Sequence, residues 1–548
     1  MTTAPTNPAP TVYWADEVAA EAASTASGGQ VVNDSKTPSG TIHVGSLRGV
    51  VLHDAIRRSV RDDGAEVEFR YGIEDLDPMD SQSLLTPDAV ERYMGVPLAH
   101  VPAPPGSSHP NYARHFAGLF LETFARLGIR PRLYWMSEQY ASGAMDPYIE
   151  RALDHADVIL EIYRTVSTVV HPAEWLPISV ICENCARSGT TRASAWTEGE
   201  VTYDCLPDLV EWATGCGHHG RTSPFGGRAK LVWNVDWAAR WGLVGATIEG
   251  CGKDLATAGG SRDRADAISR RVFDREPPRN VPYEFLNIGG RKMSTSRGEG
   301  AAAHLMAQVL PPEILRFLFL RHRPNHAINF DPTGDTIPRL FDEFDRCADA
   351  VAGRPVKGEL PQNVERMFEL SLPDDTADAR AAASLYRPPF AHLAMLVQVP
   401  GPPLEERFAA EKDAPLTPDE LAILRNREAA ARAWLTELAP ESARLTVQYD
   451  PPATLANVST AQRDFLVSLA EAAESEAPAS GEAWQALVFR VSGERGVLPR
   501  DAFAALYGVF LNRTNGPRAG WLLASLPSDF VVERMRTAAN EGAGAATI

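Results

Sequence analysis

The chain has 548 residues, too many for a single hydrophobic core, so roughly three or four domains are expected. Its 44% hydrophobic and 23% charged residues are typical of a globular protein, and no apolar run long enough to cross a membrane occurs. The formal net charge of −18 argues against a protein that coats nucleic acid non-specifically, although a local basic surface could still bind RNA. Residues 1–13 lack the basic and apolar segments of a signal peptide, so a cytoplasmic protein without membrane contact is expected.

The first part of the chain alternates predicted strands and helices. In chain order, the elements are a short helix over 14–23, a strand at 31–32, a turn-rich segment over 35–40, a helix over 45–61, a strand over 67–71, and helices over 112–127 and 147–170. A strand, a glycine-bearing turn and a helix in this order open a nucleotide-binding unit. The predicted fold class is therefore α/β, with a Rossmann-type parallel sheet.

In the rest of the chain the predicted secondary structure changes more than once. Residues 178–228 contain short predicted strands, cysteines and glycines, which indicate a small inserted domain. The α/β pattern returns over 231–249, and a strand over 284–287 precedes a glycine loop. From about Pro311 onward helical periodicity dominates, so the C-terminal part is predicted to be mostly helical.

The segment from Thr37 to Ser46 carries the residue types that a phosphate chain requires. Gly40 and Gly45 let the backbone approach a phosphate, and the helix after Gly45 offers unpaired N–H groups to it. His43 could neutralise charge on a transferring α-phosphate. The alternative for this segment alone is a helix N-terminus with a chance histidine.

Residues 289–298 form a second glycine-flanked segment, with Lys292, Ser294 and Ser296 at its centre. A lysine on a mobile loop can close over a pyrophosphate leaving group and stabilise the charge that grows in the transition state. A basic surface loop is the alternative for this segment alone. The two motifs together, in this order, indicate a nucleotide-activating enzyme.

These motifs resemble those of a known enzyme class. His43-Val44-Gly45-Ser46 resembles the HIGH signature of class I aminoacyl-tRNA synthetases, and Lys292-Met293-Ser294-Thr295-Ser296 resembles their KMSKS loop. Further stretches resemble one family within the class, the class I lysyl-tRNA synthetases; they include 101–106, 137–140, 230–237, 252–254, 321–325 and 516–518. The resemblance implies that ATP, as its Mg²⁺ complex, and an amino acid form an aminoacyl-adenylate with release of pyrophosphate. The aminoacyl group is then transferred to tRNA.

The resemblance also implies a division of the chain and a set of site residues. The implied parts are a tail with a short helix (1–28), the first half of the catalytic domain (29–177), a zinc-binding insertion (178–228), the second half with the KMSKS-like loop (229–310), a helical region contacting the tRNA stem (311–360) and a helical anticodon-binding region (361–548). Catalytic roles fall on His43, Lys292, Ser294 and Ser296. ATP binding falls on Pro38, Gly40, His43, Gly45, Ser46, Gly252, Asp254, Lys292 and Met293. Amino-acid binding falls on Ser35, Thr37, Trp233, Trp237, Leu255 and Tyr283.

Four of the six cysteines lie close together in the sequence, which favours a metal site over a disulfide framework. Cys182 and Cys185 form a CxxC knuckle, which lets two thiolates share one tetrahedral zinc. We expect a structural Zn²⁺ held by Cys182, Cys185, Cys205 and Cys216. The family pattern of two CxxC pairs is not kept in the second half, so His218 or His219 in place of Cys205, or an empty site, are the alternatives. The remaining thiols, Cys251 and Cys347, are predicted to be buried.

Recognition of lysine requires aromatic walls for its stem and a carboxylate or hydrogen bonds for its ammonium. The chain departs from the resembled family at three positions. Ser35 stands where the family typically has glycine, Leu255 where it has histidine, and Ser46 where it has asparagine. Leu255 could indicate weaker use of lysine, a lysine analogue or another amino acid, or it could be neutral. The hydroxyl of Ser46 could still cap the helix or form a hydrogen bond to a ribose.

Two further interpretations concern the acidic segment 74–80 and the overall activity. The segment could hold an ammonium group, with Asp75 and Asp77 as the pair to test, but we expect a solvated loop. The expected activity is that of a lysine–tRNA ligase. The alternatives are a specialised paralogue that activates a lysine analogue or another amino acid, and a catalytically weakened homologue that binds tRNA or amino acid. A nucleotidyltransferase without tRNA would leave the helical C-terminal part without a role.

Overall fold

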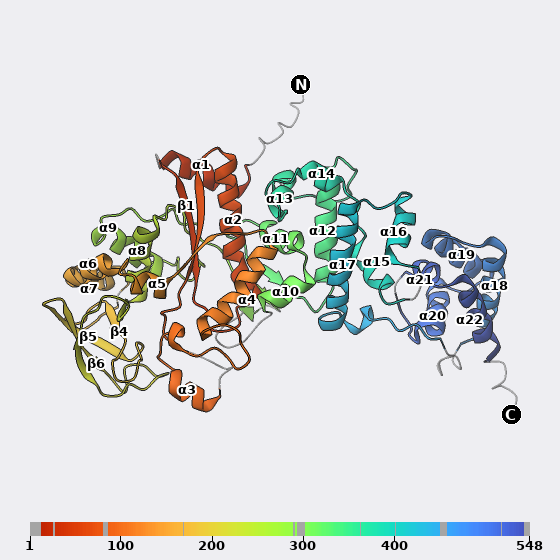
Figure 1. The fold of residues 1–548 in the computed structure, drawn as a ribbon. Helices are drawn as coiled ribbons and strands as arrows, with labels where there is room; N and C mark the ends of the chain where they lie inside the picture. Colours follow the sequence, from red (N-terminus) through yellow and green to blue (C-terminus); the bar gives the residue numbers. More distant parts are fainter. Residues whose placement is uncertain are drawn as a thin grey trace, which may run out of the picture. The chain divides into compact units, whose positions relative to one another are not determined.

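The structure, a computed structural model, describes residues 12–25, 28–80, 86–167, 169–288, 291–292, 302–361, 363–399, 402–449, 458–516 and 518–541 (Figure 1). The chain forms two units. The first unit comprises Met1–Phe330 and Cys347–Ala382, and the second comprises Asp331–Arg346 and Ala383–Ile548. Within the described ranges, no helix is long and apolar enough to cross a membrane.

A parallel sheet organises the first unit. Strands β1 (Gln30–Lys36), β2 (Val67–Ile73) and β3 (Arg132–Trp135) run parallel in the order β1-β2-β3. On the other side of β1, isolated parallel bridges join Val32 to Ile248 and Ile248 to Arg279. β1 therefore lies between segments from two distant parts of the sequence, and the predicted α/β fold with a parallel sheet is confirmed.

Helices α1 (Trp14–Thr25), α2 (Leu47–Asp62) and α4 (Tyr112–Arg126) belong to this sheet domain, and a 3-10 turn, η1 (Val44–Ser46), leads into α2. Nearly all of α2 is buried, including polar residues such as Arg48, His53 and Asp54. A charged group inside a protein needs a partner of opposite charge, because removing it from water costs free energy that an unpaired charge cannot offset. Asp54 meets this need with Arg58 at 2.9 Å on its own helix and with Arg316 at 2.8 Å on α11 (Pro312–Leu320).

The helix expected over 147–170 is two helices, so that prediction is wrong in detail. α6 (Asp146–Asp154) and α7 (Ala156–Val166) meet at His155, whose φ of −115° and ψ of 28° leave the helical region. The break turns the chain so that Leu153 and Ile159, on either side of it, both reach one apolar cluster. A single straight helix would point these two residues in different directions.

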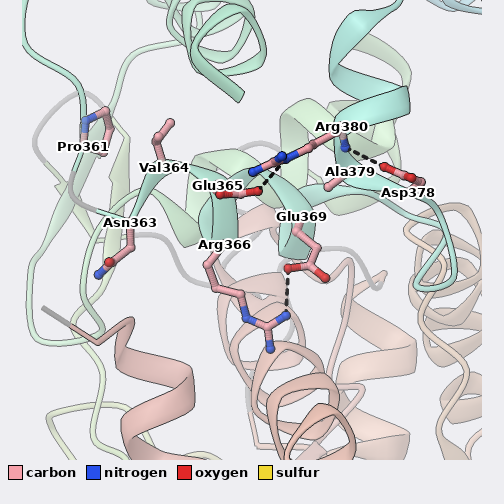
Figure 2. Close-up of a pocket in the computed structure, with 9 residues that line it drawn as sticks. All are labelled: Pro361, Asn363, Val364, Glu365, Arg366, Glu369, Asp378, Ala379 and Arg380. Carbon is pink, nitrogen blue, oxygen red and sulfur yellow. Dashed lines mark hydrogen bonds and ion pairs between the residues drawn. The ribbon is translucent and has the colours of Figure 1, made fainter. Parts of the chain in front are cut away.

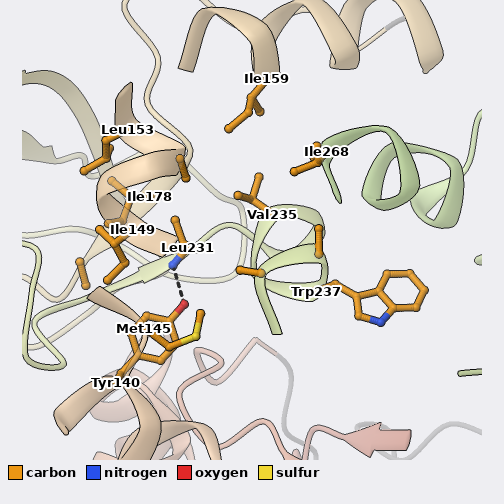
Figure 3. Packing of buried hydrophobic residues seen from close by; sticks show 14 of the residues in the cluster. Tyr140, Met145, Ile149, Leu153, Ile159, Ile178, Leu231, Val235, Trp237 and Ile268 are labelled. Atoms are coloured by element: carbon orange, nitrogen blue, oxygen red, sulfur yellow. Dashed lines mark hydrogen bonds between the residues drawn. The ribbon is translucent and has the colours of Figure 1, made fainter. Parts of the chain in front are cut away.

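That apolar cluster joins the sheet domain to the insertion (Figure 3). Its members come from α5 (Met136–Ala141), α6, α7, α8 (Trp233–Val244), α9 (Ser261–Arg271), β4 (Ile178–Val180) and β8 (Ala229–Leu231). Because β4 and β8 pair antiparallel, the chain leaves for the insertion and returns from it at adjacent points. Within the insertion, β5 (Thr191–Thr197), β6 (Glu200–Cys205) and β7 (His219–Thr222) form a small antiparallel sheet.

The remaining elements of the first unit lie before, within and after the second motif. β10 (Arg291–Lys292), β9 (Leu286–Ile288) and β11 (Ile328–Phe330) form a small sheet in that order. The helices are α3 (Pro87–Tyr93), a 3-10 turn η2 (Leu98–His100), α10 (Ala303–Val309), α11 and α13 (Val364–Ser371).

In the part of the second unit that the structure describes, the secondary structure is helical, as predicted. Its helices are α15 (Phe390–Leu396), α16 (Leu404–Lys412), α17 (Pro418–Glu437), a 3-10 turn η3 (Glu441–Ala443), α18 (Thr460–Glu476), α19 (Gly481–Glu494), α20 (Pro499–Leu511), α21 (Ala519–Ser525) and α22 (Ser528–Glu541). Two further helices, α12 (Thr336–Val351) and α14 (Ala379–Ser384), include residues of both units. The start of α17 is fixed by a capping box between Thr417 and Glu420.

Candidate active site

The predicted site residues gather at the carboxyl ends of the parallel strands. Ser35 lies at the end of β1 and Thr37 directly after it, while Gly252 and Tyr283 form a parallel bridge at the same edge. Backbone hydrogen bonds from Tyr283 to Cys251 (3.0 Å) and from Lys253 to Tyr283 (2.9 Å) hold that bridge. In open α/β sheets ligands bind at this edge, where the strand order reverses, and here it reverses beside β1.

The first motif lies next to the segment that follows the second. His43 has extended backbone (φ −79°, ψ 157°) and forms an antiparallel bridge with Ala302. The N–H of Ala303 donates to the carbonyl of Ile42 at 2.9 Å. The structure thus brings the HIGH-like turn against the start of α10, which comes directly after the second motif in the sequence.

The second motif itself is described only in part. The backbone of Lys292 ends β10, where it pairs with Asn287 of β9. Met293, Ser294 and Ser296 lie outside the described residues. The roles predicted for these four residues therefore stay predictions.

Of the two roles open to the Ser46 hydroxyl, the structure does not show the first, because its side chain does not cap α2. Its backbone is already helical (φ −70°, ψ −21°), and its N–H donates to the carbonyl of His43 at 3.0 Å. An N-cap side chain reaches the backbone only from a non-helical residue, which explains the difference. The other residues predicted for ATP near this turn, Pro38 and Gly40, are buried, and Gly45 is half-buried.

Arg48 anchors the start of α2 and is not identifiable from the sequence motif. Its guanidinium donates to the carbonyls of Phe285 (3.2 Å), Pro324 (3.0 Å) and His326 (2.7 Å). Burial lowers the pKa of Arg48 to about 10, so the group remains charged at neutral pH. The helix that follows the HIGH-like turn is therefore fixed to Phe285, just after Tyr283, and to the segment that contains Pro324 and His326.

The acidic segment after β2 is not a solvated loop, so that expectation is wrong. Glu74 and Asp75 are buried, at 3% and 1% exposure. Asp75 accepts hydrogen bonds from the backbone N–H of Ser137 at 2.8 Å and from its hydroxyl at 2.5 Å. Glu74 forms an ion pair with Arg240. The signal in the sequence is the position of these acids at the carboxyl end of a parallel strand, where an α/β fold buries polar groups.

Both carboxylate oxygens of Asp77 likewise bind other residues of the protein. The hydroxyl of Thr37 donates to one carboxylate oxygen at 2.6 Å, and Lys230 of β8 donates to the other at 2.7 Å. Lys230 also lies 3.7 Å from Glu74 and 3.7 Å from Asp236. Asp77 therefore does not offer a free carboxylate to a substrate ammonium; it fixes Thr37 at the end of β1.

The tryptophans of α8 surround a buried carboxylate. The indole N–H groups of Trp237 and Trp241 donate to Glu249 at 2.6 and 3.0 Å, and Asn33 of β1 donates to it at 2.6 Å. Trp241 is fully buried, and Trp237 is 3% exposed. Trp233 packs against Trp237 with ring centroids 5.1 Å apart and is 38% exposed. Of the predicted pocket tryptophans, Trp233 is the one with an exposed face.

Leu255 packs beside the apolar cluster of α8 and α9 and is half-buried. Its backbone makes hydrogen bonds to Gly252 (3.0 Å) and Arg262 (2.9 Å). The leucine side chain thus fills apolar space, and its position next to Gly252 and Asp254 keeps it at the same edge of the sheet as Tyr283.

The four cysteines of the insertion converge. The sulfur atoms of Cys182, Cys185, Cys205 and Cys216 all lie within 4.8 Å of one another, and among the described residues no other group of three or more His, Cys, Asp or Glu side chains is placed to hold a metal. Nδ1 of His219 instead lies 2.8 Å from a carboxylate oxygen of Asp204. Four sulfur ligands, with Cys205 at the end of β6, match the donor set of a closed tetrahedral metal site. Cys251 and Cys347 are buried free thiols, as predicted.

A cavity elsewhere in the first unit is separate from the candidate active site (Figure 2). It has a volume of about 730 Å³ and is lined by residues 361–380 around α13. Its arginines are paired with its acids: Arg366 donates to Glu369 at 2.9 Å and Arg380 to Glu365 at 3.1 Å. None of the predicted site residues lines it.

Comparisons with known proteins identify the family of the chain. The sequence matches the family described as tRNA synthetases class I (K) over residues 12–374. It is 33% identical to a lysine–tRNA ligase of Methanosarcina barkeri, covering 97% of this chain and 98% of that protein, and 34% identical to one of Archaeoglobus fulgidus, covering 96% and 100%. Among solved structures, a glutamate tRNA ligase of Elizabethkingia meningosepticum matches at 12% identity and a TM-score of 0.39, covering 93% of this chain and 99% of that one. The chain belongs to the class I lysyl-tRNA synthetase family, and it is an aminoacyl-tRNA ligase.

Proposed function

We propose that this protein attaches lysine to tRNA, through a lysyl-adenylate formed from lysine and ATP with Mg²⁺. The observation that carries the proposal is the agreement with lysine–tRNA ligases along nearly the whole length of both chains, at 33% identity. The contact between the His43 turn and the segment after the second motif supports it, because adenylate formation needs both motifs at one phosphate.

In this proposal His43 and Gly45 contact the α-phosphate, and Lys292 stabilises the leaving pyrophosphate. Ser294 and Ser296 assist the lysine loop, and Pro38, Gly40, Ser46, Gly252, Asp254 and Met293 complete the ATP site. The helical region over 311–360 contacts the tRNA stem, and residues 361–548 contact the anticodon end. The protein acts in the cytoplasm, where translation supplies its tRNA.

Pyrophosphate exchange tests the substrate directly. The assay runs with each of the twenty standard amino acids and with ornithine and β-lysine. We expect lysine to stimulate exchange most strongly. Stimulation by another compound and none by lysine would overturn the lysine assignment, and ornithine and β-lysine distinguish a specialised paralogue that uses a lysine analogue.

We also propose that the four-cysteine cluster holds one structural Zn²⁺. The sulfur atoms already lie within 4.8 Å of one another, and four thiolates leave no open position for catalysis. The purified protein should therefore contain one zinc per chain, and stripping it with a strong chelator should lower the melting temperature, because metal binding free energy adds to folding free energy.

The matched pair of variants for this site is Cys205→Ser and Cys251→Ser. Cys205 belongs to the cluster, whereas Cys251 lies outside it and donates to Asn280. Cys205→Ser should reduce zinc content well below one per chain and Cys251→Ser should leave it unchanged. Full zinc content in Cys205→Ser would contradict the ligand set and would point to His218 or His219 as a substitute.

A further inference from the structure

A second cavity lies at the edge of the parallel sheet opposite the candidate active site. It has a volume of about 680 Å³ and is lined by the starts of β2 and β3, the end of α4 with the turn that follows it, one residue of α2, and residues 373–375. All of these segments belong to the first unit. Two lining residues, Val67 and Arg132, are the first residues of β2 and β3, whereas the predicted site residues gather at the carboxyl ends of the strands. Since β2 has seven residues, about 20 Å of strand separates the two edges.

The backbone that forms the walls of this cavity is fixed within the protein. The buried Arg58 donates to the carbonyls of Leu372 at 2.7 Å and Pro373 at 3.2 Å. Gly128, in the turn after α4, has a φ of 72°, and a Cβ atom added to it would overlap the carbonyl oxygen of Pro373. Only glycine combines this conformation with so close an approach of the two segments. The walls therefore take their positions when the unit folds, without help from a ligand.

The acidic side chains of the cavity already have partners. Asp375 pairs with Arg57 at 2.8 Å and with Arg61 at 2.6 Å. Asp374 accepts hydrogen bonds from the N–H and the hydroxyl of Thr376 at 2.9 and 2.7 Å, which closes a local turn. The complete set of charged residues in the lining is four arginines and three acids: Arg57, Arg126, Arg130, Arg132, Glu68, Asp374 and Asp375.

The arginines next to the turn after α4 are held much less firmly. Glu68, the third acid, pairs with Arg70 at 2.6 Å and lies 3.4 Å from Arg132, whose side chain is 70% exposed. Among the residues that the structure describes, no acid is paired with Arg126 or Arg130, and both are exposed. An anion that enters the cavity can therefore bind these guanidinium groups without breaking an ion pair first. In a chain with a net charge of −18, such a surplus of cations in a recess is a local exception.

We propose that this cavity binds a small anion that carries two or more phosphate groups. A guanidinium group keeps its charge at any physiological pH, and its planar set of donors matches the oxygens of a phosphate in a bidentate geometry. Arg126, Arg130 and Arg132 flank one turn of the chain, so they can bind more than one phosphate of the same ligand. The volume of the cavity is within the range of small-molecule sites. This site is independent of the proposed function.

The lining selects phosphate groups and not a nucleobase. Among the described residues that line the cavity, Phe69 is the single aromatic one, and it is 4% exposed. Its ring packs against His53 and Tyr71, so it offers no face on which a base could stack. Proteins bind single-stranded RNA along grooves that combine basic residues with such stacking faces. A recess that has the arginines without the stacking faces therefore favours a compact oligophosphate over RNA.

The test titrates tripolyphosphate, which has no nucleobase, into the full chain by isothermal titration calorimetry. All proteins carry Lys292→Ala, because the loop of Lys292 is proposed to bind phosphate groups at the other edge of the sheet. We expect one tripolyphosphate per chain, and Arg126→Ala with Arg130→Ala should weaken its binding at least tenfold. The matched control, Arg92→Ala with Arg164→Ala, removes the same charge from exposed positions outside the cavity and should change the affinity by less than twofold.

The alternatives give different results. Equal weakening in the two double variants would overturn the proposal, since it would show attraction by the overall charge alone. Absence of tripolyphosphate binding to the Lys292→Ala protein would overturn it as well. Unchanged tripolyphosphate binding together with weaker tRNA binding in the Arg126 and Arg130 double variant would instead assign these arginines to an RNA backbone. Equal melting temperatures of the two double variants would exclude misfolding as the cause of a selective loss.

Discussion

Replacing Lys292 with alanine should lower the rate of lysine-dependent pyrophosphate exchange by at least about 100-fold. The reason is electrostatic: removing one preorganised donor from the charge that develops in a transition state costs about 10²–10³ in rate. The backbone of Lys292 ends β10, beside β9 and close in sequence to the segment that contacts His43. The loss should appear in kcat, because the pyrophosphate charge grows only as the bond to the α-phosphate breaks.

The control for this variant is Lys357→Ala. Lys357 is an exposed lysine in the loop between α12 and α13, outside the predicted site residues, and its loss should leave exchange unchanged. Far-ultraviolet circular dichroism should show the same helical content in both variants. A Lys292→Ala protein that retains exchange within a few fold of the wild type would contradict the role proposed for the loop.

Asp54→Ala should destabilise the first unit by about 3–5 kcal/mol, which is the effect expected when one member of a buried ion cluster is removed. The variant leaves Arg58 and Arg316 buried without their shared carboxylate. Arg316 retains its bonds to the carbonyl of Leu370 at 3.0 and 2.8 Å, but these do not balance its charge. Eight of the eleven tryptophans lie before residue 330, so tryptophan fluorescence in urea follows this unit.

The matched control is Asp63→Ala at the C-terminal end of the same helix, where the side chain is exposed. It should change stability by less than about 0.5 kcal/mol. Equal urea midpoints for the two variants would show that the cluster does not stabilise the unit.

The same cluster should make the protein sensitive to acid. Burial by itself raises the pKa of Asp54, but Arg316 and Arg58 outweigh it and lower the pKa below its ordinary value of 3.8. The stabilisation is therefore fully present above the pKa of the unfolded chain and is lost as the pH falls through the lower pKa of the folded state. Asp54→Ala should accordingly flatten the stability profile in that acidic range.

The sequence predicts those features that depend on neighbouring residues. The strand and helix around the HIGH-like turn and the helical second unit follow from local periodicity. The spacing of the cysteines indicates a metal site but leaves Cys205, His218 and His219 as candidates for one ligand. The break at His155 is missed because both halves of the segment have helical periodicity, and the reason for the break lies in the cluster that both halves reach.

The contacts that shape the site join residues far apart in the chain, so local sequence patterns do not predict them. Thr37, Asp77 and Lys230 are bonded across 40 and 153 positions, and Arg48 reaches Phe285 across 237. In the sequence, Gly49 indicates only a less stable helix. In the structure, Asp34 and Tyr283 occupy the space that a side chain at this position would need. Sequence motifs therefore identify where ATP is handled, whereas the choice of amino acid depends on tertiary contacts.

The central position of β1 has a consequence for how the protein is made. One side of β1 pairs with β2, which follows within a few dozen residues, but its other neighbour is Ile248, and the bond from Val31 to Thr247 spans 216 positions. During synthesis that edge of β1 stays open until the whole insertion has been translated. Contacts of such long sequence separation slow folding and expose strand edges meanwhile. The first unit should therefore complete its fold later, and rely more on protection from aggregation, than its early strands alone suggest.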